Sequence, residues 1–195
     1  MENKTTVINL FGGSGCGKST TAALLFARLK LMGAHVELVR EYVKYWAWND
    51  RKVREFDQLY LVGKQSAYES MLYGKVDFIV TDSPILLAGI YQDFRSKGVY
   101  KYVSRVALDF MEQGRGRGVD YKNFFLARNK PFDPRGRWET EDEAKEIDRF
   151  IYGYLGDISK ELSYDPPISI FGENDKRDYE VMSHLPTFNP SDVQP

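Results

Sequence analysis

The sequence predicts an α/β fold in which a five-stranded parallel β-sheet lies between two layers of helices. Two observations support this prediction: short apolar runs alternate with longer segments of helical periodicity, and glycine, proline or polar turns separate them. This alternation is typical of parallel strands joined by crossover helices. With 195 residues, 43% of them hydrophobic, the chain is long enough for one domain with a buried core.

The elements follow from the apolar pattern along the chain. Strands are predicted where short apolar runs end in glycine or a polar residue, at 6–11, 35–39, 76–81, 123–127 and 167–171. Helices are predicted where apolar residues recur with helical spacing, at 20–32, 50–71, 85–111 and 139–162. Alternate glycines within 113–118 are expected to break the third helix. We expect a single domain over 1–195, with its core at about 5–175 and an irregular, proline-containing tail at about 185–195.

The composition excludes several classes of protein. One cysteine cannot form an intramolecular disulfide, and two histidines with one cysteine do not supply a structural zinc site. The polar N-terminus leads into a short strand-like run, which is neither a signal sequence nor a membrane span of about 20 apolar residues. We therefore expect a cytoplasmic protein without membrane attachment. Residues 95–137 hold eleven Lys and Arg against four acidic residues, a net charge of +7, which favours a phosphate-rich ligand unless these residues form a solvated surface.

The clearest chemical signal lies between the first predicted strand and the first predicted helix. Residues 12–19 satisfy the pattern G-x-x-x-x-G-K-[ST] of a phosphate-binding P-loop. In such a loop the backbone N–H groups surround a β-phosphate, the lysine reaches the β- and γ-phosphates, and the hydroxyl ligates Mg²⁺. The predicted cofactors are therefore ATP and Mg²⁺, with Lys18 catalytic and Ser19 a metal ligand. The expected nucleotide-binding residues are Gly12, Gly13, Ser14, Gly15, Cys16, Gly17, Lys18, Ser19 and Thr20.

Two carboxylates follow predicted strands and should lie at the same edge of the sheet as the P-loop. Asp82 ends the apolar run 78–81 like a Walker B residue, which predicts a Mg²⁺ ligand, although an acid near the acceptor hydroxyl is an open alternative. Glu41 ends the second strand, from which it could take the proton of an attacking hydroxyl or hold the acceptor. The alternative is that Arg40 and Glu41 form an exposed surface pair.

Basic and aromatic residues supply further candidates. Arg128, Arg135 and Arg137 flank a proline-containing segment, and a loop bearing guanidinium groups can neutralise the charge of a transferring γ-phosphate. At least one of them is predicted to be catalytic; a solvated basic loop is the alternative. Arg115 and Arg117 are weaker candidates for contacts with acceptor phosphates. One aromatic residue between 42 and 48 could stack on a planar base, although most of the aromatics must pack the core.

Together these residues resemble a family of small P-loop kinases of nucleosides and nucleotides, the group that includes the nicotinamide-riboside kinase domain. The resemblance covers most of residues 5–175. It rests on the P-loop, on 40–42, 58–60, 63–65 and 81–84, and on the segment from Phe125 to Arg137. It implies a three-layer P-loop NTPase fold with five parallel strands, a helical substrate-binding region after the second strand and an arginine-bearing lid. The chain is also similar to deoxynucleoside kinases, whose base acts from the position of Glu41. After the third strand it has Asp82-Ser83-Pro84 rather than Asp-Arg-Tyr or Glu-Arg-Ser, so the acceptor stays open.

The sequence thus predicts an ATP- and Mg²⁺-dependent P-loop kinase that transfers the γ-phosphate to a hydroxyl of a nucleoside-like small molecule. A second reading is a kinase acting on a hydroxymethylated base within DNA, as some phage-encoded P-loop kinases do, because the +7 segment suits a DNA backbone. The third reading is a P-loop ATPase without kinase activity. A GTPase is disfavoured, because the sequence has no Asn-Lys-x-Asp guanine motif.

Overall fold

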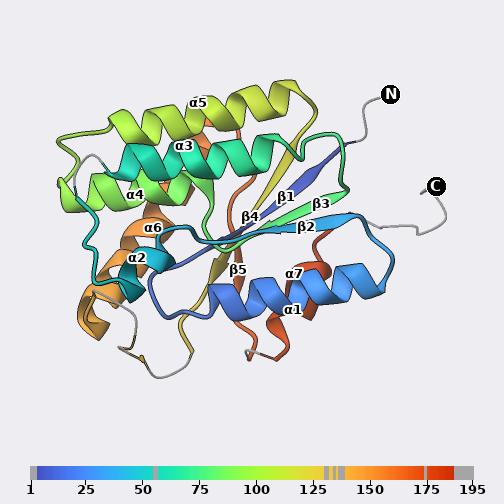
Figure 1. Cartoon of the computed structure of the whole chain (residues 1–195), viewed down its shortest axis with the longest axis horizontal. Helices are drawn as coiled ribbons and strands as arrows, with labels where there is room; N and C mark the ends of the chain where they lie inside the picture. Colours follow the sequence, from blue (N-terminus) through green and yellow to red (C-terminus); the bar gives the residue numbers. More distant parts are fainter. Residues whose placement is uncertain are drawn as a thin grey trace.

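The computed structural model describes residues 4–54, 57–129, 132–133, 135, 139–173 and 175–186, without the side chain of residue 47. Within them the chain alternates between strands and helices (Figure 1). The strands are β1 (Thr6–Phe11), β2 (Val36–Val39), β3 (Phe78–Thr81), β4 (Asp120–Leu126) and β5 (Ile168–Ile170). The helices are α1 (Lys18–Leu31), α2 (Lys44–Trp48), α3 (Asp57–Ser70), α4 (Ile85–Arg95), α5 (Tyr102–Gly116), α6 (Glu141–Leu162) and α7 (Arg177–Met182).

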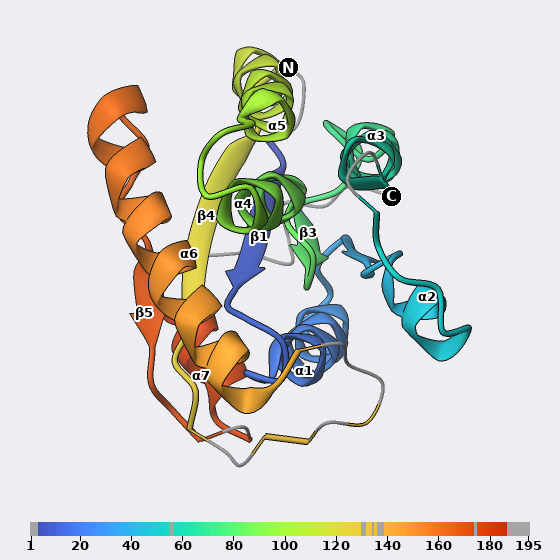
Figure 2. The same cartoon turned by 90° about the vertical axis from the view of Figure 1, so that its left-hand side faces the viewer.

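The five strands form one parallel sheet in the order β2-β3-β1-β4-β5. Every residue of the central strand β1 is buried, and its side chains alternate between two hydrophobic clusters. Val7 and Phe11 pack with α3, α4, α5 and α6, whereas Ile8 and Leu10 pack with α1 and α7. Figure 2 shows α1 and α7 on one side of the sheet and α4, α5 and α6 on the other. The predicted three-layer α/β P-loop fold with five parallel strands is confirmed.

The prediction of a single helix over 85–111 is wrong, both in its continuity and in its C-terminal end. This segment consists of two helices, because Lys97 and Gly98 take positive φ angles of 50° and 76° that end α4. α5 then continues through most of the predicted break at 113–118 and ends at Gly116. Gly114 lies inside this helix. A side chain at this position would collide with the hydroxyl of Tyr121, because a Cβ there would overlap it. The glycine therefore allows α5 to lie close to β4.

Other boundaries also differ from the sequence prediction. α3 begins at Asp57 rather than at residue 50, and the short helices α2 and α7 were not predicted. A helix of five or six residues is too short to show periodicity in its apolar positions. The acid-rich start of α6 is confirmed and forms a capping box, in which the Thr140 side chain accepts from the Glu143 N–H and Glu143 bonds back to Thr140.

The C-terminal part of the chain completes the second cluster. Val181 of α7 is buried against α1, so the packed core extends beyond residue 175. Residues 187–195 of the predicted tail lie outside the described residues. Among the residues that are described, no helix has the length and apolar character needed to cross a membrane.

Candidate active site

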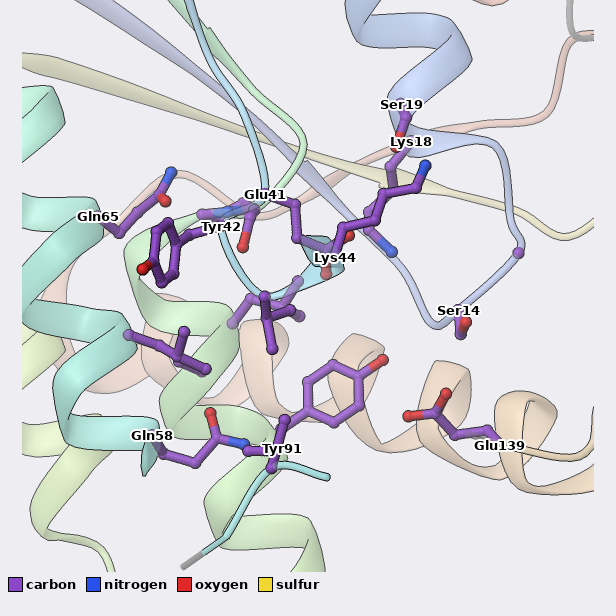
Figure 3. Close-up of a pocket in the computed structure, with 18 of the residues that line it drawn as sticks. Ser14, Lys18, Ser19, Glu41, Tyr42, Lys44, Gln58, Gln65, Tyr91 and Glu139 are labelled. Atoms are coloured by element: carbon purple, nitrogen blue, oxygen red, sulfur yellow. The ribbon is translucent and has the colours of Figure 1, made fainter. Parts of the chain in front are cut away.

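A pocket of about 260 Å³ lies where β1, β2 and β3 end. One wall comes from the P-loop and the start of α1, and a second comes from residues 41–44 after β2. The opposite wall comes from α3, α4 and residues 135 and 139. Figure 3 shows side chains from these segments facing the same space. Open α/β sheets bind ligands at this edge.

The P-loop connects β1 to α1 as predicted. Gly12, Gly15 and Gly17 have φ angles of 140°, 82° and 105°, which side chains with a Cβ rarely adopt. These angles turn the chain back toward the first turn of α1. Ser19 and Thr20 are exposed there and line the pocket.

Lys18 and Cys16 occupy different sides of this loop. The Lys18 ammonium group donates to the carbonyl oxygens of Gly12 (2.7 Å) and Gly13 (2.9 Å), and Lys18 also lines the pocket. Cys16 is fully buried in the cluster formed by α1 and α7, so its side chain packs in the core. Lys18 therefore lies where an anionic ligand could compete for its ammonium group.

A fully buried arginine of α7, absent from the predictions, supports the loop from behind. Arg177 donates to the carbonyl oxygens of Cys16 (2.5 Å), Gly172 (2.8 Å) and Ala127. Burial lowers the pKa of Arg177. These bonds tie the P-loop to the ends of β4 and β5. A single arginine in a short helix gives no sequence signal for this role.

The two predicted carboxylates lie side by side. β2 and β3 are hydrogen-bonded neighbours, with Val39 opposite Thr81, so the residues that follow them meet. The Glu41 N–H donates to Asp82 Oδ1 at 2.8 Å, and Asp82 is buried. Glu41 lines the pocket, where removal from water and the nearby Asp82 raise its pKa, while Lys18 opposes the shift. Glu41 therefore does not form the exposed surface pair considered as the alternative.

The donors near the P-loop suit a magnesium ion in chemical type. Mg²⁺ prefers oxygen ligands and is usually held by one or two carboxylates, substrate phosphates and water. Ser19 supplies an exposed hydroxyl in the first turn of α1. Asp82, which is buried and is not among the residues that line the pocket, supplies a carboxylate just after β3. In the described part of the chain, His, Cys, Asp and Glu form no group of three or more that could hold a metal ion. A magnesium ion here would thus depend on nucleotide phosphates for its remaining ligands.

Two glutamines of α3 line the opposite half of the pocket. Gln65 donates to Thr81 Oγ1 at 3.0 Å. Gln58 is only 4% exposed and also lines the pocket. Tyr91 of α4 faces the same space, and removal from water raises its pKa well above the usual value. The amide groups of Gln58 and Gln65 can donate to and accept from a polar ligand in this half of the pocket.

Aromatic residues that follow β2 pack against α3, and some of them also line the pocket. Tyr42, Trp46 and Tyr60 pack against one another, with Trp46 stacked on Tyr60 at a centroid distance of 6.0 Å. The guanidinium carbon of Arg51 lies 3.7 Å from the centre of the Trp46 ring. Tyr42 and Trp48 line the pocket, and Trp48 is 66% exposed at its rim. Among the aromatic residues from 42 to 48, Tyr42 and Trp48 are thus the two that line the pocket.

The predicted lid arginines have separate locations. Arg135 lines the pocket and pairs with Asp133 at 2.7 Å. Arg128 does not line it; its side chain is 9% exposed and pairs with Asp148 of α6 at 2.8 Å. Arg137 lies outside the described residues. Arg95 of α4, which was not among the predicted site residues, lines the pocket and pairs with Glu139 at 3.8 Å.

Part of the positive charge of the +7 segment is paired with acidic residues of the protein. Several of its basic side chains form ion pairs in different parts of the fold. Arg115 pairs with Glu112 and stacks over Tyr164, and Lys122 pairs with Asp165. Neither Arg115 nor Lys122 lines the pocket. Pairing within the protein reduces the charge available to an extended polyanion.

Comparisons with known proteins agree with this geometry. The sequence model of the AAA_28 family, described as AAA domain, matches residues 7–169. No curated protein matches the sequence. The structure is similar to deoxyadenosine kinase from M. mycoides with products bound, at 16% identity and a TM-score of 0.56, covering 92% of this chain and 97% of that one.

Two further solved structures show the same fold. Thymidylate kinase from Ehrlichia chaffeensis has 15% identity and a TM-score of 0.55, with 92% of this chain and 98% of that chain covered. The Mycobacterium tuberculosis APS kinase CysC in complex with AMPPNP and APS has 14% identity and a TM-score of 0.52, with 93% and 97% covered. At these identities the likeness establishes the fold.

Proposed function

We propose that this chain, which belongs to the AAA_28 family of AAA domains, is an ATP- and Mg²⁺-dependent kinase that phosphorylates a hydroxyl of a nucleoside-like small molecule. The observation that carries the proposal is that one pocket contains both a P-loop and, opposite it, a wall that bears the amide side chains of Gln58 and Gln65. Nucleotide and acceptor would then meet with Glu41 between them. Three solved structures of similar fold are named as kinases, which supports the proposal.

The P-loop half would bind the triphosphate. The backbone N–H groups of the loop and the Lys18 ammonium group are the donors for the phosphate oxygens. Lys18 would exchange its bonds to the Gly12 and Gly13 carbonyls for bonds to phosphate. Ser19 and Asp82 would hold Mg²⁺, which when bound neutralises charge on the phosphates.

Glu41 is the proposed general base for the acceptor hydroxyl. It lies after β2 on the pocket wall, and its raised pKa makes it a stronger base than an ordinary carboxylate. Arg135 lines the same pocket and would neutralise charge on the transferring phosphoryl group. Both residues act on the transfer step rather than on nucleotide binding.

The acceptor half favours a planar molecule with amide-like polar groups. Gln58 and Gln65 each offer a donor and an acceptor, which match the edges of a nucleobase or a nicotinamide. Tyr42 and Trp48 supply aromatic faces at the rim. A DNA acceptor is less favoured, since several basic side chains of the +7 segment are held in ion pairs with acidic residues of the protein. An ATPase would leave this half of the pocket without a role.

The proposal is tested by phosphate transfer from γ-labelled ATP. The acceptor panel contains free nucleosides, nucleotides, nicotinamide riboside and hydroxymethylated DNA, and ADP release is measured in parallel. We expect label in a small nucleoside-like product, with ADP release stimulated by the same compound. Label in DNA alone would favour the base kinase, and ADP release without any labelled acceptor would favour an ATPase.

A further inference from the structure

We infer that Asp148 of α6 is a positioning residue that fixes the first half of the P-loop through Gly13, and that Arg128 acts by holding Asp148. This inference goes beyond the proposed function and relies only on its nucleotide-binding half. It assigns Arg128 to the support of the loop instead of to a lid. The nucleotide pocket does not include either residue among those that line it.

The contact between α6 and the P-loop is direct. The Gly13 N–H donates to Asp148 Oδ1 at 2.5 Å, and Arg128 Nε donates to Asp148 Oδ2 at 2.8 Å. The side chains of Arg128 and Asp148 are 9% and 13% exposed. Hydrogen bonds to a charged group in such a protected place are stronger than those between neutral groups. Each carboxylate oxygen thus has one defined partner.

Gly13 is a glycine because α6 approaches so closely. The P-loop pattern leaves this position free, so the motif does not explain the residue. A Cβ on Gly13 would lie 2.7 Å from Asp148 Oδ1 and 2.8 Å from both the Ala144 carbonyl oxygen and Ile147 Cγ2. Two of these three atoms belong to residues of α6 other than Asp148. The sequence is therefore adapted to the docking of this helix on the loop.

This contact reaches the catalytic lysine through Gly13 itself. Gly13 gives its N–H to Asp148, and its carbonyl oxygen accepts from Lys18 Nζ at 2.9 Å. A shift of Gly13 would move one of the two carbonyl groups that hold Lys18. Arg128 lies just after β4 and Asp148 lies on α6, so this ion pair links both elements to the P-loop through Gly13.

Removal of Asp148 should change the nucleotide affinity in opposite directions, depending on whether Asp148 positions the loop or acts only through its charge. Asp148 is an anion beside a loop that would bind phosphates, so on charge alone its removal should tighten nucleotide binding. If Asp148 positions the loop, its removal should weaken binding, because the donors then have to be ordered when the nucleotide binds. ADP is a suitable probe, since its binding does not depend on an acceptor.

The experiment measures ADP affinity by calorimetry and thermal unfolding for the whole chain. We expect Asp148→Ala to raise the ADP Kd roughly 10- to 100-fold, the range for loss of a hydrogen bond to a charged group. Asp148→Asn should raise it less, because its amide oxygen can still accept from Gly13. Asp93→Asn is the matched control: Asp93 is a buried carboxylate that binds the Ser104 hydroxyl and does not line the pocket. It should leave the ADP Kd unchanged even if it lowers the unfolding temperature.

The role of Arg128 is decided by a double variant. If Arg128 acts only through Asp148, then Arg128→Gln should weaken ADP binding less than Asp148→Ala does, and the double variant should match Asp148→Ala. Additive effects would show that Arg128 acts independently of Asp148 and would overturn its assignment. An unchanged or tighter ADP Kd in Asp148→Ala would overturn the role of Asp148. If that variant does not fold, unchanged affinity in both Asp148→Asn and Arg128→Gln has the same meaning.

This test is separate from that of the proposed kinase activity. Wild-type protein that binds ADP but labels no acceptor would contradict the phosphotransferase and leave the Asp148 measurements valid. Conversely, normal phosphate transfer together with normal ADP binding by Asp148→Ala would contradict only the positioning role.

Discussion

Ionisation of Glu69, a fully buried carboxyl group on α3, should make the protein less stable as the pH rises. Burial raises the pKa of Glu69 to about 8, from an ordinary value of 4.5, and the neighbouring Gln65 and Tyr73 side chains offset only part of this shift. Between these two values the folded chain holds a proton that the unfolded chain has released. The free energy of unfolding should therefore fall with increasing pH in this window.

The size of the effect follows from the two pKa values. The slope is about 1.4 kcal/mol per pH unit, so the whole window corresponds to about 5 kcal/mol. Below 4.5 both states are protonated and the contribution is complete, and above about 8 it is lost. Glu69→Gln removes the titrating group while keeping a similar shape.

Urea unfolding of wild type and Glu69→Gln at about pH 5.5, 6.5 and 7.5 measures this directly. We expect the free energy of unfolding of Glu69→Gln, relative to that of wild type, to increase by about 3 kcal/mol between the lowest and the highest pH. All other groups titrate in both proteins and therefore cancel in this difference. Glu161→Gln, the same change at an exposed position of α6, should run parallel to wild type. A constant difference between wild type and Glu69→Gln would refute the reasoning, because Glu69 would then be ionised or protonated equally in both states.

Four further predictions concern the pocket. Lys18→Ala should abolish ADP production with unchanged thermal unfolding, and normal turnover would contradict the P-loop assignment. Glu41→Gln should reduce transfer by about 10²- to 10⁴-fold while calorimetry still detects ATP binding. In wild type kcat/KM should fall on acidification at a higher pH than for an ordinary carboxylate, because burial raises the pKa of Glu41; parallel loss of ATP affinity would indicate a structural role. Ser19→Ala and Asp82→Ala should each raise the Mg²⁺ concentration for half-maximal rate. An unchanged Mg²⁺ titration with loss of transfer in Asp82→Ala would instead place Asp82 on the acceptor side. Arg135→Ala should lower kcat, by up to about 10³- to 10⁵-fold, with little change in ATP Kd. If both kcat and ATP Kd match those of wild type, Arg135 is a solvated surface residue without a catalytic role.

The sequence by itself determined the features that depend on neighbouring residues. The P-loop was predicted with its strand and helix, since glycines at positive φ and the residues that follow them form a local pattern. The five strands were also predicted, because a parallel strand buried on both faces appears as a continuous apolar run. The pairing of Glu41 with Asp82 then required only that β2 and β3 be neighbours.

The tertiary structure decided the roles of isolated polar residues. Gly13 and Asp148 are 135 positions apart in the sequence, and Cys16 and Arg177 are 161 apart, yet each pair forms a hydrogen bond. Arg128 was grouped with Arg135 by proximity in the sequence, but it turns toward α6 while Arg135 lines the pocket. Apolar periodicity reports which face of an element is buried, because burial is a property of the whole face. The partner of one buried polar group depends on how helices dock on the sheet, and that docking is set by contacts between residues far apart in the chain.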